Sequence, residues 1–492
     1  MTYHLSRVEH WIQNRNIEFY PTNINRQLIF TPFAEYIILH WRLITNNDVL
    51  VNFIQYVSML LSVLLSILIV KTQKGNKLTQ LFAAILTATV PMGIMQSTST
   101  QNDYVVALFL LATIYFSLKN DILYLALSVG LGVFTKNTYL IFAFPFVLYW
   151  LFKYLRIERK KTMKGVLLII IFTVLINISH WRRNFAYYDS PLGPKIMIVG
   201  MTNQSYEPKY IMSNIVRNIA SQIGLPNKKY NGTVDSIVHL IHTKIGLATN
   251  DPKVTWVPAS YATLFATHED RAGNYVLVVL FALAVLMAFF KKSPLFPTYI
   301  TLFTGWVLFI ILLKWQPWQS RLELPFFIAS CPFIALTITQ EVKREVWIKL
   351  FCVILIALSF PFVLGYLPFD SKNVDAISSN RPLTLNVLTF KNTRYERFLL
   401  ESPVNRSYDA LVKKIKQKGL TEIGLNLGVD SWEYPLWVAL RRQGVTANIS
   451  NVNSASRYDA VISDNTEGSL NYKPDNAKET VRFGNLEMTL LK

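Results

Sequence analysis

Charged residues are scarce in this chain. Asp, Glu, Lys and Arg make up 16% of its 492 residues, whereas they make up about a quarter of a soluble domain. Hydrophobic residues account for 52%, and they gather in runs too long for one small soluble core. About 20 consecutive apolar residues cross the hydrocarbon core of a bilayer as a helix, so the composition predicts an integral membrane protein.

Cysteine is nearly absent. Cys331 and Cys352 both lie inside apolar runs, which excludes a disulfide framework and a cysteine-rich metal site. Walker loops, dinucleotide fingerprints, HExxH motifs and nucleophile elbows are missing as well. The formal net charge is +19, but basic residues accumulate in the cytoplasmic loops of membrane proteins. Basic stripes interleaved with aromatics are missing outside the runs, so nucleic acid is not an expected partner.

Ten apolar runs divide the chain. They lie at residues 49–70, 80–95, 103–118, 121–135, 138–154, 165–179, 274–290, 296–314, 322–338 and 346–366. Several are short for a full span, so tilted helices or local thinning of the bilayer are expected. The predicted fold class is a mainly α, polytopic membrane protein with about ten transmembrane helices.

Basic loops fall in alternate gaps between these runs, and the positive-inside rule makes their common face cytoplasmic. They lie at residues 71–77, 153–164, 291–292 and 343–344. The long segments then face the other side. We predict a first external loop with interfacial helices (1–48), a transmembrane domain (49–366) that includes a large external loop (180–273), and an extracytoplasmic domain (367–492).

The chain becomes soluble in composition after Pro368. YDALVKKIKQKG predicts an amphipathic helix ended by Gly419, and DSWEYPLWVALRRQG a helix capped by Asp430. TEIGLNLG, VTANIS and RYDAVISDN predict strands between and after them. Helices that alternate with strands at this spacing predict a small α/β domain.

The topology places Met1 on the external side, although MTYHLSRVEHWIQNRN lacks the apolar core of a signal peptide. We therefore expect a first transmembrane helix to be missing from this chain. The alternative is that the N-terminal segment stays cytoplasmic and that one span is miscounted.

Two ionisable residues stand at external helix mouths. Asp103 follows the polar run STSTQN and is either a functional group at the membrane edge or an N-cap. Arg321 lies in KWQPWQSRLELPFF, framed by Pro317 and Pro325. A guanidinium there could hold a phosphate in bidentate fashion, and we favour this over an arginine that snorkels to the headgroups.

Weaker candidates lie close to the predicted spans. His268, Glu269 and Asp270 in HEDRAGN could ligate a divalent cation, but three consecutive residues rarely face one ion, so a polar helix cap is favoured. Lys136 in FTKNTYL either contacts a lipid phosphate or snorkels to the membrane surface.

Two further patterns lie towards the ends of the chain. His4, Arg7 and His10 recur at helical spacing, for which we favour a solvated interfacial face. DSWEYPLW, which contains Trp432, mixes aromatic and acidic residues and could contact sugar, although a cap with packing aromatics is the default interpretation.

Segments along nearly the whole chain resemble the GT-C class of membrane glycosyltransferases, especially the branch related to protein mannosyltransferases and aminoarabinose transferases. In chain order these segments are TYHLSRVEHWIQN with FYPT, STSTQNDYVVALFL, FTKNTYL, RRNFAYYDSPLGP, HEDRAGN, WQPWQSRLELPFF and DSWEYPLW. The resemblance implies that a sugar moves, with inversion, from a polyprenyl-phosphate donor to a glycan, lipid or protein acceptor on the extracytoplasmic face.

The resemblance also implies roles for individual residues. Asp103 matches an acidic position of the catalytic site that serves the donor or a metal. Arg321 matches the basic position that binds the lipid-linked phosphate, and Lys136 and Arg183 are softer candidates for that headgroup. The expected contacts to acceptor or sugar are His4, Arg7, Tyr104, Glu269, Asp270 and Trp432.

A divalent cation could assist the reaction, but its ligands are not identified. The resemblance places the family's catalytic-base Asp just before a segment like MTYHL, which leaves open whether this chain is active by itself. Two rivals remain: a transporter or flippase for a lipid-linked sugar, and a non-catalytic glycolipid-binding homologue. Because the apolar runs are almost free of charge, surface chemistry is favoured over passage. The expected location is a bacterial plasma (inner) membrane.

Overall fold

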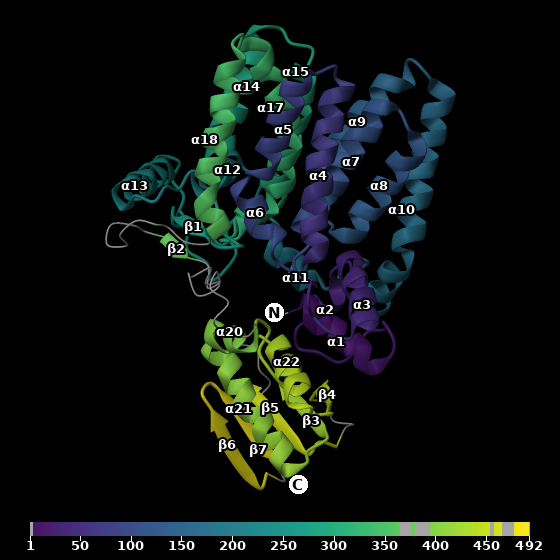
Figure 1. Cartoon of the computed structure of the whole chain (residues 1–492), viewed down its shortest axis with the longest axis vertical. Helices are drawn as coiled ribbons and strands as arrows, with labels where there is room; N and C mark the ends of the chain where they lie inside the picture. Colours follow the sequence, from purple (N-terminus) through teal and green to yellow (C-terminus); the bar gives the residue numbers. More distant parts are fainter. Residues whose placement is uncertain (1–2, 365–375, 379–393, 453–456, 465–476, 492) are drawn as a thin grey trace. The chain divides into compact units, whose positions relative to one another are not determined.

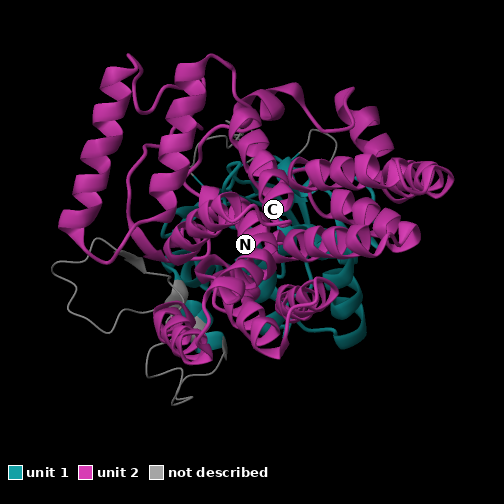
Figure 2. Cartoon of the chain, turned by 90° about the horizontal axis from the view of Figure 1, so that it is seen from above, with its two compact units in different colours: residues 1–51, 381–492 teal, residues 52–380 magenta. Residues whose placement is uncertain are grey.

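The computed structural model describes residues 3–364, 376–378, 394–452, 457–464 and 477–491. The chain forms two compact units (Figure 2). Unit 1 comprises residues 1–51 and 381–492, and unit 2 comprises residues 52–380. The boundary expected at Pro368 lies outside the described residues.

Unit 2 is built mainly from helices (Figure 1), and many of them are apolar. They are α4 (Phe53–Thr72), α5 (Lys77–Ala88), α6 (Pro91–Ser97), α7 (Asp103–Lys119), α8 (Ile122–Thr135), α9 (Tyr139–Leu155), α10 (Arg159–Tyr188), α14 (Tyr275–Phe290), α15 (Phe296–Leu312), α17 (Leu324–Glu341) and α18 (Glu345–Leu364). Each predicted run coincides with a helix, except that the second is broken into α5 and α6. The two pieces meet at an angle of 65°, where Pro91 cannot continue the helical hydrogen bonds.

Within the described residues, four helices are long and apolar enough to cross a membrane, or five if α5 and α6 form one broken span. The four are α4, α10, α17 and α18, and α8, α9, α14 and α15 are shorter apolar helices. A mainly helical, multi-pass membrane protein is thereby confirmed. The total of about ten spans stays a prediction.

The predicted polar loop 180–273 contains three helices of its own and one strand. They are α11 (Lys195–Met201), α12 (Pro208–Gln222), α13 (Lys228–Lys244) and β1 (Phe265–Thr267). The segment IMSNIVRNIASQIG forms most of α12. β1 pairs in parallel with β2 (Ala376–Ser378).

Unit 1 combines helices with one sheet. Its helices are α1 (His4–Asn14), α2 (Arg26–Ile29), α3 (Phe33–Thr45), α20 (Arg394–Glu401), α21 (Pro403–Lys418) and α22 (Tyr434–Gln443). Its strands are β3 (Glu422–Asn426), β4 (Asn448–Asn451), β5 (Ala460–Asp464), β6 (Glu479–Phe483) and β7 (Leu486–Leu490). The strand order is β4-β3-β5-β7-β6. β4, β3 and β5 run parallel, and β7 runs antiparallel to both β5 and β6.

The predicted elements of this sheet region are largely confirmed. α21 ends at Gly419, whose φ of 63° places it in the left-handed region typical of a helix C-cap. The three predicted strands are β3, β4 and β5. The predicted cap of α22 is wrong, because the helix begins only after Glu433, with Pro435 in its first turn. Asp430 instead forms an ion pair with Arg26.

The hairpin β6–β7 was not predicted. Its two strands flank Gly484 and Asn485, and Gly484 has a φ of 62°. A two-residue Gly-containing turn between alternating segments is a recognised hairpin signal. The segments TVRF and LEMTL carry that alternation, so the sequence contained the information.

The expectation of a solvated face for His4, Arg7 and His10 is wrong. Their exposed fractions are 4%, 1% and 1%. His4 Nδ1 lies 2.9 Å from Glu35 Oε1, and Arg7 Nη1 donates to the same oxygen at 3.3 Å. His10 Nε2 lies 2.6 Å from Oε1 of Glu433, which is equally buried. These residues are paired in the interior of unit 1, where burial of a charge requires a partner.

Candidate functional site

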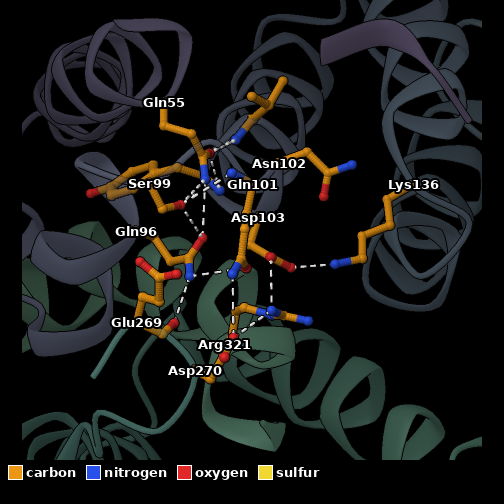
Figure 3. Close-up of polar contacts among 12 residues, drawn as sticks. Gln55, Gln96, Ser99, Gln101, Asn102, Asp103, Lys136, Glu269, Asp270 and Arg321 are labelled. Atoms are coloured by element: carbon orange, nitrogen blue, oxygen red, sulfur yellow. Dashed lines mark hydrogen bonds and ion pairs between the residues drawn. The ribbon is translucent and has the colours of Figure 1, made fainter. Parts of the chain in front are cut away.

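Asp103 is the first residue of α7, and its side chain is only 3% exposed. Its Oδ1 lies 2.5 Å from Lys136 Nζ, and its Oδ2 lies 3.4 Å from Arg321 Nε (Figure 3). The N-cap position belongs to Asn102. The Asp103 carboxylate thus contacts two cations, Lys136 and Arg321. It also lies in the first turn of α7, at the positive end of the helix dipole.

Arg321 lies in the short helix α16 (Gln319–Leu322), between α15 and α17. Its Nη1 donates to Asp270 Oδ1 at 2.5 Å, so the guanidinium bridges two carboxylates. Glu323 follows α16 directly, and its buried carboxyl group accepts hydrogen bonds from Trp306 (2.9 Å) and Gln222. These bonds hold the end of α16 in place.

Lys136 ends α8, and burial lowers the pKa of its amine, whereas the nearby Asp103 carboxylate opposes that shift. Burial would raise the pKa of Asp270, but Arg321, His268 and Gln101 bring it below its ordinary value of 3.8. Asp270 is therefore ionised at neutral pH.

The four charged side chains differ in exposure. Those of Lys136 and Arg321 are 20% and 16% exposed, and that of Asp270 is 32% exposed, whereas that of Asp103 is 3% exposed. Lys136 and Arg321 therefore offer accessible cationic groups, while Asp103 is buried against both of them. An ammonium and a guanidinium held together are suited to an anionic oxygen such as that of a phosphate.

Buried amide side chains fix the start of α7. Gln55 Oε1 accepts hydrogen bonds from the backbone N–H groups of Tyr104 (2.9 Å) and Val105 (3.3 Å). Its Nε2 donates to Gln96 Oε1 at 3.0 Å and to Ser99 Oγ at 3.3 Å. Gln55, on α4, thus satisfies N–H groups that a helix start leaves without a helical partner.

Further amide side chains link the start of α7 to Glu269 and Asp270 of the HEDRAGN segment. Gln96 Nε2 donates to the Glu269 carbonyl at 2.6 Å, and Gln101 Nε2 donates to Asp270 Oδ1 at 3.3 Å (Figure 3). Gln55 and Gln96 were not among the predicted residues. A glutamine inside an apolar run is the signal that could have found Gln55, because polar side chains in such runs are costly without partners.

Gln55→Leu is expected to destabilise unit 2 by about 1–3 kcal/mol, because it leaves buried N–H groups of α7 without acceptors. It is also expected to displace Asp103, which begins that helix. Ser62→Ala is the control on α4, because the buried Ser62 hydroxyl has no hydrogen-bond partner among the described residues. Thermal unfolding of both variants tests this, and equal losses of stability would contradict it.

The structure thus brings together Asp103, Lys136, Asp270 and Arg321, and Glu269 joins them through its backbone carbonyl. Tyr104 is fully buried, with its hydroxyl 3.4 Å from the Thr87 carbonyl. Arg183 lies near the end of α10 and is half-buried. The remaining predicted contacts, His4, Arg7 and Trp432, belong to unit 1.

The HEDRAGN segment does not form a metal centre in the part of the chain that the structure describes. No group of three or more His, Cys, Asp and Glu residues there could hold a metal ion. His268 Nδ1 instead accepts a hydrogen bond from the backbone N–H of Asp270 at 3.1 Å. The favoured interpretation as a helix cap is not supported, because α14 begins after Asn274 and has no side-chain cap hydrogen bond.

Residues 31–181, which include Asp103 and Lys136, match the family described as dolichyl-phosphate-mannose-protein mannosyltransferase. The resemblance to the GT-C class of membrane glycosyltransferases is confirmed.

One solved structure has a similar fold over the whole chain. It is the crystal structure of ArnT from Cupriavidus metallidurans bound to undecaprenyl phosphate. The TM-score is 0.52 and the sequence identity 11%, and the match covers 100% of this chain and 93% of that one. None of the curated protein sequences matches this chain.

Proposed function

We propose that this protein transfers a sugar, with inversion, from a polyprenyl-phosphate-linked donor to an acceptor on the extracytoplasmic face of a bacterial inner membrane. The observation that carries the proposal is the pair of partly exposed cations, Lys136 and Arg321, held on the buried Asp103 at the ends of three helical segments. The similar fold of ArnT, solved with undecaprenyl phosphate, supports this choice of donor.

The proposed reaction forms a bond between an acceptor oxygen and the anomeric carbon and breaks the bond from that carbon to the phosphate oxygen. The acceptor hydroxyl loses its proton to a base, and the polyprenyl phosphate leaves with an added negative charge. Lys136 and Arg321 stabilise that charge. Asp103 engages both cations and positions them, and Asp270 is the more exposed carboxylate that could reach the substrate.

A transporter for a lipid-linked sugar is the second candidate. The break between α5 and α6 favours it, because transporters use discontinuous helices. The positions of the charges favour the transferase: Asp103 begins α7, Lys136 follows α8 and Arg321 precedes α17. Transporters bind near the bilayer midplane, whereas these groups stand at helix ends.

The test uses the full chain in nanodiscs with radiolabelled mannosyl-, glucosyl- and aminoarabinosyl-phosphoundecaprenol. Transferase activity releases one undecaprenyl phosphate for each labelled sugar lost from the lipid, and Asp103→Asn is expected to lower that rate at least about 100-fold. The matched control is Asp121→Asn, at the start of α8, since Asn also serves as an N-cap. In proteoliposomes, movement of label between leaflets with the sugar–phosphate bond intact would instead establish the transporter.

A further inference from the structure

Unit 1 contains a cavity that the proposed chemistry does not use. Its volume is ≈ 390 Å³, and it lies beyond the carboxyl-terminal ends of β3 and β5, which are parallel neighbours. The loop between β3 and α22, including Val429 and Trp432, forms one wall. Asp464 at the end of β5 and Asn485 in the β6–β7 turn contribute others.

The sheet topology explains why a crevice forms here. The chain leaves β3 through α22 to reach β4 on one side of β3, whereas β5 lies on the other side. β3 and β5 are therefore neighbours at a switch point, where the order of the strands in the sheet reverses direction. In α/β sheets such a switch point is the usual place for a ligand, and the cavity falls within the range of about 300–1,000 Å³ that small-molecule sites occupy.

The loop that carries Trp432 is held in place by Asp464, whose side chain is buried. Asp464 Oδ1 accepts a hydrogen bond from the Gly428 backbone N–H at 2.9 Å, and its Oδ2 accepts one from the Ser431 hydroxyl. Trp432 follows directly and is 38% exposed at the cavity. An aromatic ring at an open cavity provides contact area at low entropic cost, because its side chain has only two χ angles.

The lining chemistry identifies the ligand class. The apolar surface of Trp432 and Val429 suits the C–H face of a sugar ring, and the Asp430, Ser431 and Asn485 side chains suit its hydroxyl groups. The described lining contains two aspartates, Asp430 and Asp464, and neither lysine nor arginine. Asp430 is already paired with Arg26, so an acidic sugar or a phosphate would find no cationic partner among the described lining residues, whereas a neutral or amino sugar needs none.

We propose that this cavity binds a glycan without acidic groups, with one sugar ring stacked on Trp432. The inference deepens the proposed function and rests on it, because it names such a glycan as the acceptor class. Glycan binding is measured without sugar transfer, so the glycan-binding inference and the proposed transferase function can fail separately.

The experiment measures binding of fluorescently labelled maltohexaose, mannohexaose and glucosamine hexamer to the full chain in nanodiscs without donor. We expect saturable binding of at least one of these oligosaccharides. Trp432→Ala should raise its Kd about tenfold or more. Trp432→Tyr keeps an aromatic face and should bind nearly as well as the wild type. Trp347→Ala, at an exposed tryptophan of α18, is the control and should change nothing. Thermal unfolding confirms that each variant is folded.

Failure of all three probes to saturate at about 10 mM, or binding that Trp432→Ala leaves unchanged, would overturn the inference. Donor turnover in the same preparation then decides the proposed function independently. If turnover is absent but Trp432-dependent binding is present, the transferase proposal fails and the glycan site stands.

Discussion

Arg321→Ala is expected to lower the rate of sugar transfer by about 10²–10³-fold, the loss typical of removing one preorganised donor to a developing anion. The guanidinium contacts Asp103 at 3.4 Å and Asp270 at 2.5 Å, so its removal takes away the cation that these two carboxylates share and leaves Lys136 on Asp103. An anionic phosphate is then repelled where it was attracted. Single-turnover kinetics with the donor accepted by the wild type measure the effect on the chemical step.

Two further variants separate charge from geometry. Arg321→Lys keeps the positive charge but cannot bridge two carboxylates as a planar fork, so an intermediate rate is expected. Arg344→Ala removes an exposed arginine before α18 and should leave the rate unchanged. Equal rates for wild type and Arg321→Ala would remove Arg321 from the catalytic site.

Glu433→Ala is expected to destabilise unit 1 by about 3–5 kcal/mol, the cost of removing one partner from a buried ion pair. His10 Nε2 lies 2.6 Å from Glu433 Oε1, and Gln27 Nε2 donates to Oε2 at 2.8 Å. Trp437 Nε1 donates to Oε1 at 3.0 Å. All four side chains are buried, so the alanine removes an acceptor that three buried polar groups share. Thermal unfolding monitored by limited proteolysis within residues 394–452 measures the loss.

The Glu433 carboxylate is also expected to make the stability of unit 1 depend on pH. Burial would raise the pKa of Glu433, but His10, Gln27 and Trp437 hold it below its ordinary value of 4.5. A group whose pKa is lowered by folding stabilises the fold above its unfolded pKa and loses that contribution as the pH falls through the folded value. Wild-type unit 1 should therefore weaken below pH 4.5, whereas Glu433→Gln should be less stable at neutral pH and lack this acid-dependent step. Identical acid profiles would contradict the assignment.

The sequence predicts the helices of unit 2 well, because long apolar runs have one simple solution in a bilayer. It also identifies Asp103, Lys136, Asp270 and Arg321 individually, since each interrupts or borders an apolar run. Their association is beyond sequence reasoning. Lys136 and Asp103 are 33 residues apart in sequence, and Arg321 and Asp270 are 51 apart, so only tertiary packing brings them together.

The interior of unit 1 shows the same limit more strongly. α1 alone looks like an amphipathic surface helix, and its His4, Arg7 and His10 read as solvated. Glu433, which pairs with His10 and Gln27, lies 406 residues beyond Gln27 in the sequence. Periodicity within one helix carries no information about so distant a partner. By contrast, the β6–β7 hairpin is a local feature that a closer reading of the Gly484–Asn485 turn would have predicted.

The most direct test of the phosphate-binding cluster is binding of undecaprenyl phosphate to the full chain in nanodiscs, with undecaprenol as the uncharged control lipid. Wild-type protein is expected to bind the phosphate form selectively, and the double variant Lys136→Met with Arg321→Met to lose that selectivity at least about 100-fold. If both proteins distinguish the two lipids equally well, the cluster does not bind the donor phosphate and the central claim is wrong.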